Sequence, residues 1–191
     1  MTERLTRTMR DELLATAQAL ADAARSATLP HFRSPTLLAD NKLAFGFDPV
    51  TVADRACEQA MRALLARLRP DDAILGEEFD DRPGTSGLTW VLDPIDGTRA
   101  FLSGTPTWGV LIAVGDRDGP LLGLIDQPYI GERFIGAPGL ARLTGPRGDH
   151  PLATRPPRPL SEATLFTTFP EVGTQAEEAA FHQLSRQVRL T

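Results

Sequence analysis

The stretch WVLDPIDGTRAF, residues 90–101, is the most informative part of this sequence. Its apolar run predicts a strand that carries Asp93 to the strand end. Pro94 then fixes φ and removes a backbone donor, Ile95 presents its carbonyl, and Asp96 returns a second carboxylate beside the first. Carboxylates and carbonyls are the oxygen ligands that hard cations such as Mg²⁺ take. The stretch therefore predicts a cation site.

The next two residues add an anion pocket to this prediction. Gly97 and Thr98 can open a helix, whose first N–H groups are free to face an anion. A cation and a phosphate would then lie side by side. The alternative is a turn in which Asp93 and Asp96 only cap backbone groups, because Asp, Pro and Gly are common turn residues.

Two further acidic residues stand at the ends of expected elements. Asp54 lies at a helix start, and Glu77 follows the short apolar run AIL, residues 73–75. Each also has a plainer interpretation, since Thr51 and Asp54 fit a capping box and Glu77 fits a solvated acidic loop. Taken with the aspartate pair, the two positions favour a Mg²⁺ site made of carboxylates.

Nitrogen and sulfur ligands offer no comparable pattern. His31, His150 and His182 are scattered without metal-ligand spacing, and a single cysteine cannot form a Cys-x-x-Cys site. We expect the histidines at the surface or at an interface. Cys57 falls on the apolar face of an expected helix, which predicts a packed thiol rather than a nucleophile.

Two helices are expected before the strands. Leucine and alanine at helical spacing predict an amphipathic helix over roughly residues 8–28, ending before Pro30. A second helix is expected from Thr51, with an apolar face that continues until Pro70.

Short β-type runs follow the helices. They occupy residues 73–75, 89–92, 108–114, 121–125 and 133–136. The turn residues of GDRDGP, 115–120, predict a hairpin between the third and fourth runs. The Pro/Arg/Gly-rich stretch 145–161 predicts a loop, followed by a strand at 164–169 and a helix over 174–188. Helices that cover an antiparallel-leaning sheet predict an α+β layered fold.

Composition excludes several classes of protein. The chain has 191 residues, 41% of them hydrophobic and 24% charged, which suits a globular protein with a real core. A net charge of −5 without a basic block argues against binding to nucleic acid or to anionic membranes. No apolar stretch approaches the roughly 18 residues of a membrane span, and the acidic N-terminus lacks a signal-peptide core. One cysteine allows no internal disulfide, and we expect a cytoplasmic protein.

Three motifs together resemble those of the inositol monophosphatase family of Mg²⁺-dependent, lithium-sensitive phosphatases. They are DPVTVAD at 48–54, GEE at 76–78 and LDPIDGTRAF at 92–101, in the order and spacing of the family. Within that family, the IDQP and ERFIG segments, residues 125–128 and 132–136, look most like the histidinol-phosphatase branch.

The resemblance implies a layered α-β-α(-β-α) sugar-phosphatase-like fold that is incomplete at the C-terminus. Residues 1–145 would form the α+β part with the metal and phosphate site, 146–160 a Pro-rich loop, and 161–191 the start of a C-terminal α/β part. The implied reaction is hydrolysis of L-histidinol phosphate to L-histidinol and phosphate, a step of histidine biosynthesis. An inositol-1-phosphatase and a nucleotide 3'-phosphatase of the same superfamily are the alternatives. The partner is then a small phosphate ester, and a homodimer is also implied.

The resemblance further assigns ligands, with two or more Mg²⁺ ions as cofactor. Glu77, Asp93 and the carbonyl of Ile95 would hold the first Mg²⁺, and Asp93 and Asp96 would help to hold a second. Asp96 and the N–H groups of Gly97 and Thr98 would contact the phosphate of the substrate.

Catalytic roles are also implied. Glu77 and Thr98, the latter hydrogen-bonded to Asp54, would orient and deprotonate the attacking water. On the substrate side, Arg99 and the stretch 126–134 are candidates, with Glu132 as a carboxylate that could select the cationic amine of histidinol phosphate. A surface ion pair between Glu132 and the adjacent arginine is the alternative.

One part of the family pattern is absent from the sequence. The final metal-binding aspartate of the family lies in a Trp-Asp-type motif in the C-terminal part, and the tryptophans here are Trp90 and Trp108. We therefore expect a fragment of a longer product, or a chain completed by association, with apolar sheet faces left uncovered. A natural short variant with little activity is the third possibility. An inactive fragment or a metal-binding interaction module is the alternative to an enzyme.

Overall fold

The computed structural model describes residues 5–35, 37, 39–41, 49–167 and 173–191. The chain divides into two compact units, Met1–Leu152 and Ala153–Thr191. Among the described residues, no helix has both the length and the apolar character that crossing a membrane requires.

Both expected N-terminal helices are confirmed. Helix α1 spans Arg7–Thr28, with Thr6 as N-cap accepting a hydrogen bond from the amide of Met9. Helix α2 spans Val52–Leu68 and begins with the expected capping box of Thr51 and Asp54. Each helix buries a stripe of small and branched apolar side chains, such as Leu13 and Leu20 on α1. Regular apolar spacing therefore sufficed to locate these two helices.

The first unit contains a seven-stranded sheet in the order β3-β4-β5-β6-β7-β8-β9. Strands β3 and β4 are parallel and every later neighbour is antiparallel. The strands are β3 Ala73–Leu75, β4 Thr89–Asp96, β5 Gly109–Asp116, β6 Gly119–Gln127, β7 Glu132–Ala137, β8 Leu140–Gly145 and β9 Gly148–Pro151. A separate two-stranded sheet pairs β1, Ala39–Asn41, with β2, Pro49–Thr51.

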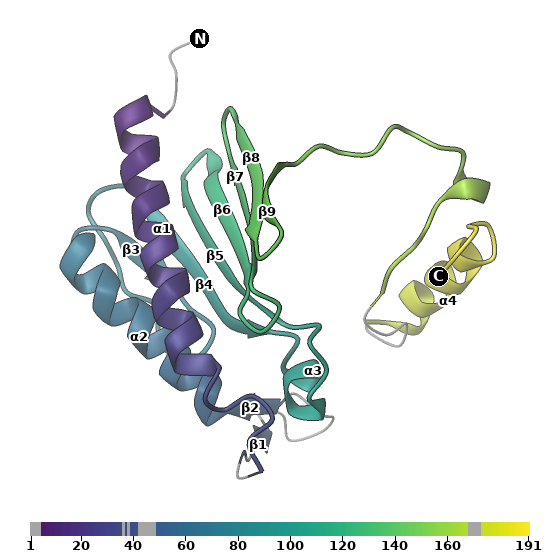
Figure 1. The fold of residues 1–191 in the computed structure, drawn as a ribbon, viewed down its shortest axis with the longest axis horizontal. Coiled ribbons are helices and arrows are strands. Elements are labelled where there is room, and N and C mark those ends of the chain that lie inside the picture. Colours follow the sequence, from purple (N-terminus) through teal and green to yellow (C-terminus); the bar gives the residue numbers. More distant parts are fainter. Residues whose placement is uncertain (1–4, 36, 38, 42–48, 168–172) are drawn as a thin grey trace. The chain divides into compact units, whose positions relative to one another are not determined.

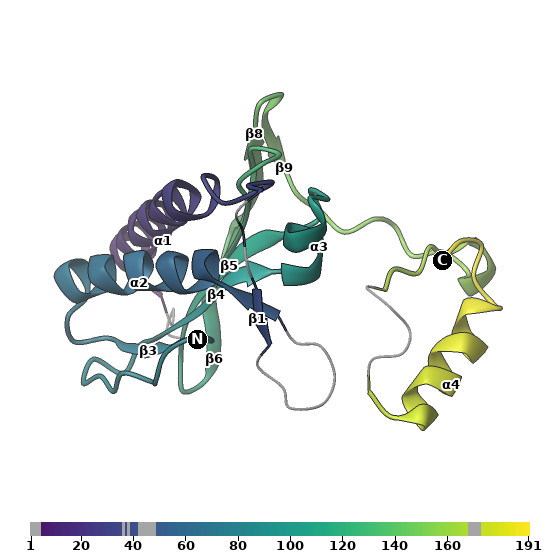
Figure 2. The same ribbon diagram turned by 90° about the horizontal axis from the view of Figure 1, so that it is seen from below.

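Helices α1 and α2 lie side by side on one face of the seven-stranded sheet (Figures 1 and 2). Alternate strand residues such as Trp90, Ile112 and Leu124 point to the helices and are buried. This layer of side chains is the main core. Helices on a mixed sheet make an α+β fold, and the expected fold class is confirmed.

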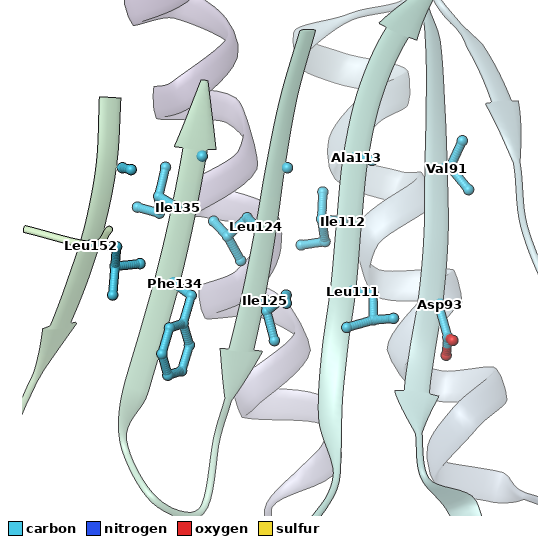
Figure 3. Close-up of a pocket in the computed structure, with 13 residues that line it drawn as sticks. Val91, Asp93, Leu111, Ile112, Ala113, Leu124, Ile125, Phe134, Ile135 and Leu152 are labelled. Atoms are coloured by element: carbon cyan, nitrogen blue, oxygen red, sulfur yellow. The ribbon is translucent and has the colours of Figure 1, made fainter. Parts of the chain in front are cut away.

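The other face of the sheet is apolar and open. Val91, Leu111, Ile125 and Phe134 line a hollow of about 660 Å³, with Asp93 at its edge (Figure 3). Val91 is 42% exposed and Ile125 48% exposed. None of the helices described within the first unit covers this face, so the expected uncovered apolar sheet face is present.

Two expectations for the first unit are wrong in part. The stretch 145–161 is not all loop, because 148–151 form β9, which pairs with the unexpected strand β8 at 140–145. Every residue of β9 is exposed, so its composition carries no apolar pattern. Strand β4 also continues past 92 to Asp96, with a register shift between Asp93 and Asp96 that accommodates the proline.

The second unit is small and sparsely packed. A 3₁₀ turn spans Leu160–Glu162, and helix α4 spans Gln175–Ser185 behind a capping box of Thr174 and Glu177. The expected helix over 174–188 is thus confirmed. The strand expected at 164–169 is wrong in its described part, which makes a single parallel bridge from Thr164 to Leu190. Residues 168 and 169 lie outside the described residues.

Candidate functional site

Strand β4 delivers the two aspartates of the central motif to different environments. Asp93 shares a face with Val91, since side chains two residues apart point the same way, and it is half-buried beside the apolar hollow (Figure 3). Pro94 and Ile95 are buried, whereas Asp96 is exposed. The register shift between the two aspartates therefore separates a sheltered carboxylate from a solvated one.

Gly97 turns the chain from β4 into the short helix α3, Thr98–Ser103. Its φ is +87°, a left-handed conformation that favours glycine, and a Cβ there would lie 2.9 Å from the carbonyl oxygen of Thr107. The expected helix start at 97–98 is confirmed. The Thr98 hydroxyl donates to the Ile95 carbonyl over 3.1 Å.

An aromatic cluster fixes this turn from behind. The ring centroid of Phe101 on α3 lies 4.8 Å from that of Trp108 and 5.3 Å from that of Phe32. All three rings are buried, together with Ile95. The turn that bears the candidate phosphate contacts is thus anchored by packing rather than left as a free loop.

Asp54 is buried and performs the capping role that its spacing suggested. Its Oδ2 accepts from the amide of Thr51 over 2.8 Å and from the Thr51 hydroxyl over 2.6 Å. Among the described hydrogen bonds, the Thr98 hydroxyl is directed to Ile95 and not to Asp54 as the resemblance implies. Burial raises the pKa of Asp54, and the nearby Glu77 charge adds to the rise.

Glu77 follows β3, and its backbone is held from α2. The amides of Glu77 and Glu78 donate to Oε2 of Glu58 over 2.9 and 2.7 Å. Glu58 was not singled out from the sequence. The signal was a glutamate beside the buried stripe of α2 with an arginine four residues later, a favourable pair on a helix.

Glu77, Asp96 and Asp54 all lie within electrostatic reach of Asp93. Burial raises the pKa of Asp93 to about 7, and the charges of Glu77, Asp96 and Asp54 and a hydrogen bond with Glu77 add to the effect. Like charges that cannot all ionise favour a shared proton, and a cation relieves the same repulsion.

The donor set fits a hard divalent cation. Oδ1 of Asp93 is buried and has no hydrogen-bond partner, which leaves a carboxylate oxygen open to a ligand. Over the described ranges, no three His, Cys, Asp or Glu side chains already stand in a metal-binding arrangement.

Cys57 and the histidines behave as expected. The buried thiol of Cys57 donates to the carbonyl of Pro94 over 3.4 Å, and burial raises its pKa. His150 and His182 are exposed and His31 is partly exposed. Lys42, which by the resemblance would correspond to a lysine near the metal site, lies outside the described residues.

The residues expected to contact the substrate differ in their surroundings. Asp126 is buried and accepts from Arg25 of α1 and from Arg133, so this part of the stretch joins the sheet to α1. Glu132 pairs with Arg147 over 3.5 Å, and the suggested pair with its neighbour Arg133 is wrong. By strand register, Glu132 lies three strands from Asp96.

Known phosphatases are similar in sequence to this chain. The chain is 37% identical over 182 residues to the chloroplastic bifunctional phosphatase IMPL2 of Arabidopsis thaliana, covering 94% of this chain and 51% of that protein. It is 41% identical over 115 residues to a histidinol-phosphatase of Chlorobaculum parvum, covering 60% of this chain and 44% of that protein. The chain spans about half the length of these curated relatives.

A solved structure shares the fold. It is an inositol monophosphatase from Zymomonas mobilis, 39% identical, with a TM-score of 0.78 over 94% of this chain and 68% of that one. The sequence model of the inositol monophosphatase family matches residues 9–190. The match runs through both helices, the whole sheet and the carboxylate cluster, and the chain belongs to the inositol monophosphatase family.

Proposed function

We propose that this chain is a Mg²⁺-dependent phosphomonoesterase that hydrolyses L-histidinol phosphate to L-histidinol and phosphate, a step of histidine biosynthesis. One observation carries the proposal: the buried, unpartnered Oδ1 of Asp93 among the carboxylates of Glu77, Asp96 and Asp54. Carboxylates held close together despite their mutual repulsion suit a metal-assisted hydrolase. The relatives named above are phosphatases.

The proposed ligands come from β4 and from the segment after β3. Glu77, Asp93 and the carbonyl of Ile95 would hold one Mg²⁺, and Asp93 with Asp96 would hold a second. When bound, the ions would make a coordinated water more acidic and neutralise charge on the phosphate. The backbone N–H groups after Gly97 would bind phosphate oxygens, in a turn that the aromatic cluster keeps in place.

Proton transfer would fall to residues of this chain. Thr98 and Glu77 would orient the attacking water. Its proton would pass through the Thr98 hydroxyl to Asp54, for which that hydroxyl would have to turn away from the Ile95 carbonyl. Burial raises the pKa of Asp54, which makes its carboxylate a better base than a solvated aspartate. The capping bonds from Thr51 fix the direction of that carboxylate.

The choice of substrate rests on finer features. The IDQP and ERFIG segments and the histidinol-phosphatase relative favour histidinol phosphate. Arg99 and Glu132 are the proposed substrate contacts. Inositol 1-phosphate is a second candidate, because the inositol monophosphatase of Zymomonas mobilis is 39% identical to this chain. A homodimer and a cytoplasmic location stay predictions from the sequence.

The test is phosphate release by the purified chain from histidinol phosphate, inositol 1-phosphate and a nucleotide 3'-phosphate, each with and without Mg²⁺. Mg²⁺-dependent turnover of histidinol phosphate above the other two is expected. The Asp93→Asn variant serves as the matched control, because it keeps the shape of the side chain and removes its charge.

The remaining outcomes identify the alternatives. Preference for inositol 1-phosphate or for the nucleotide would change the proposed substrate but not the proposed reaction, phosphomonoester hydrolysis. A folded chain that binds Mg²⁺ and hydrolyses none of the three would be a metal-binding module, and the enzymatic proposal would fall.

A further inference from the structure

A buried carboxylate outside the expected set lies next to the site. Glu58 is 0% exposed and stands four residues after Asp54, one turn further along α2. Burying a charge is costly unless it is paired and hydrogen-bonded. The partners of Glu58 therefore indicate what this charge does in the fold.

Both oxygens of Glu58 are occupied. Oε1 accepts from Nε of Arg62 over 2.7 Å, and Oε2 accepts from the backbone amides of Glu77 and Glu78 over 2.9 and 2.7 Å. Hydrogen bonds from amides to a charged acceptor are stronger than those between neutral groups. Glu58 thus ties α2 directly to the backbone that carries Glu77.

Arg62 extends the same connection. Its second guanidinium nitrogen donates to the carbonyl of Phe79 over 3.0 Å, and its guanidinium carbon lies 5.8 Å from the centre of the Phe79 ring. Two amides and one carbonyl within residues 77–79 are therefore held by Glu58 and Arg62, which are themselves one helical turn apart. We call these two residues the α2 clamp.

The sheet does not hold this segment in the same way. The ladder of β3 with β4 ends at the pair Leu75 and Val91, before Glu77. The position of the Glu77 backbone relative to β4 is then fixed from α2. The same helix carries Asp54, so one rigid element places two of the four carboxylates.

Gly76 is an independent sign of how closely the segment approaches the clamp. A Cβ on Gly76 would lie 1.9 Å from Oε1 of Glu58 and 2.5 Å from a guanidinium nitrogen of Arg62. Contacts this short do not occur for real side chains, so the residue before Glu77 needs to be glycine while the clamp is closed.

We infer that Glu58 is a positioning residue: the α2 clamp sets the place of the Glu77 carboxylate opposite Asp93, and thereby the cation affinity of the site. The effect on cation affinity rests on the proposed function, whereas the clamp itself rests on the hydrogen bonds described above. Glu58 would touch neither the cation nor the substrate. Outer-shell partners of metal ligands typically contribute about 10- to 100-fold in metal affinity or activity.

The first test compares Glu58→Ala and Glu58→Gln with the wild-type chain. Mn²⁺ alone, titrated under paramagnetic resonance, reports cation affinity without substrate. Glu58→Ala should weaken Mn²⁺ binding by about 10- to 100-fold. Glu58→Gln keeps one acceptor oxygen for the two amides, so its loss of Mn²⁺ affinity should be distinctly smaller. The same order is expected for kcat/KM in Mg²⁺.

Amide hydrogen exchange gives a readout that does not depend on activity. The amides of Glu77 and Glu78 should be protected in the wild-type chain and exchange faster in Glu58→Ala, even without any metal. Exchange of these two amides at unprotected rates in the wild-type chain would overturn the clamp.

Asp72→Asn is the matched control. Asp72 is equally buried and pairs with an arginine, Arg69, at 2.7 Å, but it contacts no part of residues 76–79 in the described hydrogen bonds. It should lower Tm and leave Mn²⁺ affinity within about twofold. Equal loss of affinity in Asp72→Asn and Glu58→Ala would mean general destabilisation, and the positioning role would be wrong.

A double-mutant cycle with Gly76→Ala sharpens the test. Alone, Gly76→Ala should weaken Mn²⁺ binding because its Cβ displaces Glu58. With Glu58→Ala the obstructing carboxylate is gone, so the added cost of Gly76→Ala should fall to less than half of its value alone. Additive losses would contradict the proposed contact.

These outcomes separate the inference from the proposed function. If the wild-type chain binds no Mn²⁺ and turns over no substrate, the proposed function falls, and amide protection alone still decides whether the clamp exists. If the wild-type chain binds Mn²⁺ and Glu58→Ala binds it equally well, the function stands and the positioning role falls.

Discussion

A sheltered aspartate lies near each end of strand β4, and the two differ in their hydrogen bonding. Beside the first residues of the strand, Asp72 accepts from Arg69, from the Ser86 hydroxyl over 2.6 Å and from the indole N–H of Trp90 over 2.9 Å. At the far end, one oxygen of Asp93 is buried without a partner, and three other carboxylates act on it. A satisfied charge is typical of a structural role, and an unsatisfied one of a ligand-binding role.

The pKa values express the same contrast. Burial acts to raise the pKa of Asp72, but hydrogen bonds from Arg69, Ser86 and Trp90 outweigh it and hold the pKa below its usual value. Burial and like charges raise the pKa of Asp93 to about 7. The pKa values of the two aspartates thus differ because of their partners and not because of burial alone.

The largest expected effect is on activity, at the end of β4 that carries Asp93. Asp93→Asn should reduce kcat/KM by at least roughly 1,000-fold, more than the loss typical of an outer-shell residue, because it removes a proposed ligand of both ions. Without metal, its Tm should equal or exceed that of the wild-type chain, since repulsion with Glu77 is relieved. A marked fall in Tm would break the contrast with Asp72.

The second largest expected effect is on stability, at the end of β4 beside the hydrogen-bonded Asp72. Asp72→Ala should lower the free energy of unfolding by about 3 kcal/mol, because Arg69 and the Trp90 indole lose a buried acceptor. Urea unfolding followed by circular dichroism measures this. The turnover of the folded fraction should stay unchanged; a parallel loss of turnover would show that the two ends are coupled.

The pH dependence of the metal-free chain should have opposite signs at the two ends. The pKa of Asp93 rises from 3.8 to about 7 on folding, so the folded state binds more protons between these values and stability falls as pH rises. The lowered pKa of Asp72 contributes stability above its usual value, which is lost as pH falls below about 4.

Melting curves of the wild-type chain and Asp93→Asn in chelator, from pH 4 to pH 8, isolate the first contribution. The difference in Tm between the two should move by about 3 °C per pH unit between pH 5 and pH 7, in favour of the variant. A difference that is flat with pH would contradict the raised pKa.

The smallest effect tests one bond of the Asp72 set. Ser86→Ala removes the hydroxyl that donates to Asp72 and should lower stability by about 1 kcal/mol. The acid limb of the stability curve should shift to higher pH, because the aspartate loses one of its stabilising donors. Calorimetry at pH 3 and pH 7 measures both; an equal loss at the two values would show that the bond does not act on the charge.

Periodic parts of the chain could be predicted from sequence. Helices α1 and α2 have regular apolar stripes and, in α2, a capping box, and both lie within a residue or two of their predicted bounds. The short strand β3 was located to the residue. Local signals suffice where a segment carries its own start, stop and buried face.

The sheet edge could not be predicted, because its strands carry no apolar pattern. Strand β9, GDHP, is fully exposed, and its Gly and Pro residues indicate a loop. The reverse error occurs at residues 164–167, which have strand-like composition but make a single bridge in the part of the chain described. Strand formation depends on a partner, which composition does not report.

At the site, sequence indicated which carboxylates gather but not what holds them. Asp54, Glu77, Asp93 and Asp96 stand at element ends, and the other three act electrostatically on Asp93. Glu58 was missed because its partners are amides 19 and 20 residues away, a relation that appears only after folding. The backbone carries no residue-type signal for such a contact.

The open apolar face of the sheet has a consequence for the chain in solution. Val91 and Ile125 are both more than two-fifths exposed there. Large exposed apolar patches favour association, whose rate rises with the square of protein concentration, whereas unfolding is independent of concentration. Dilution, more than cooling, should therefore preserve this protein during handling, and a hydrophobic dye should fluoresce on it while it is fully folded.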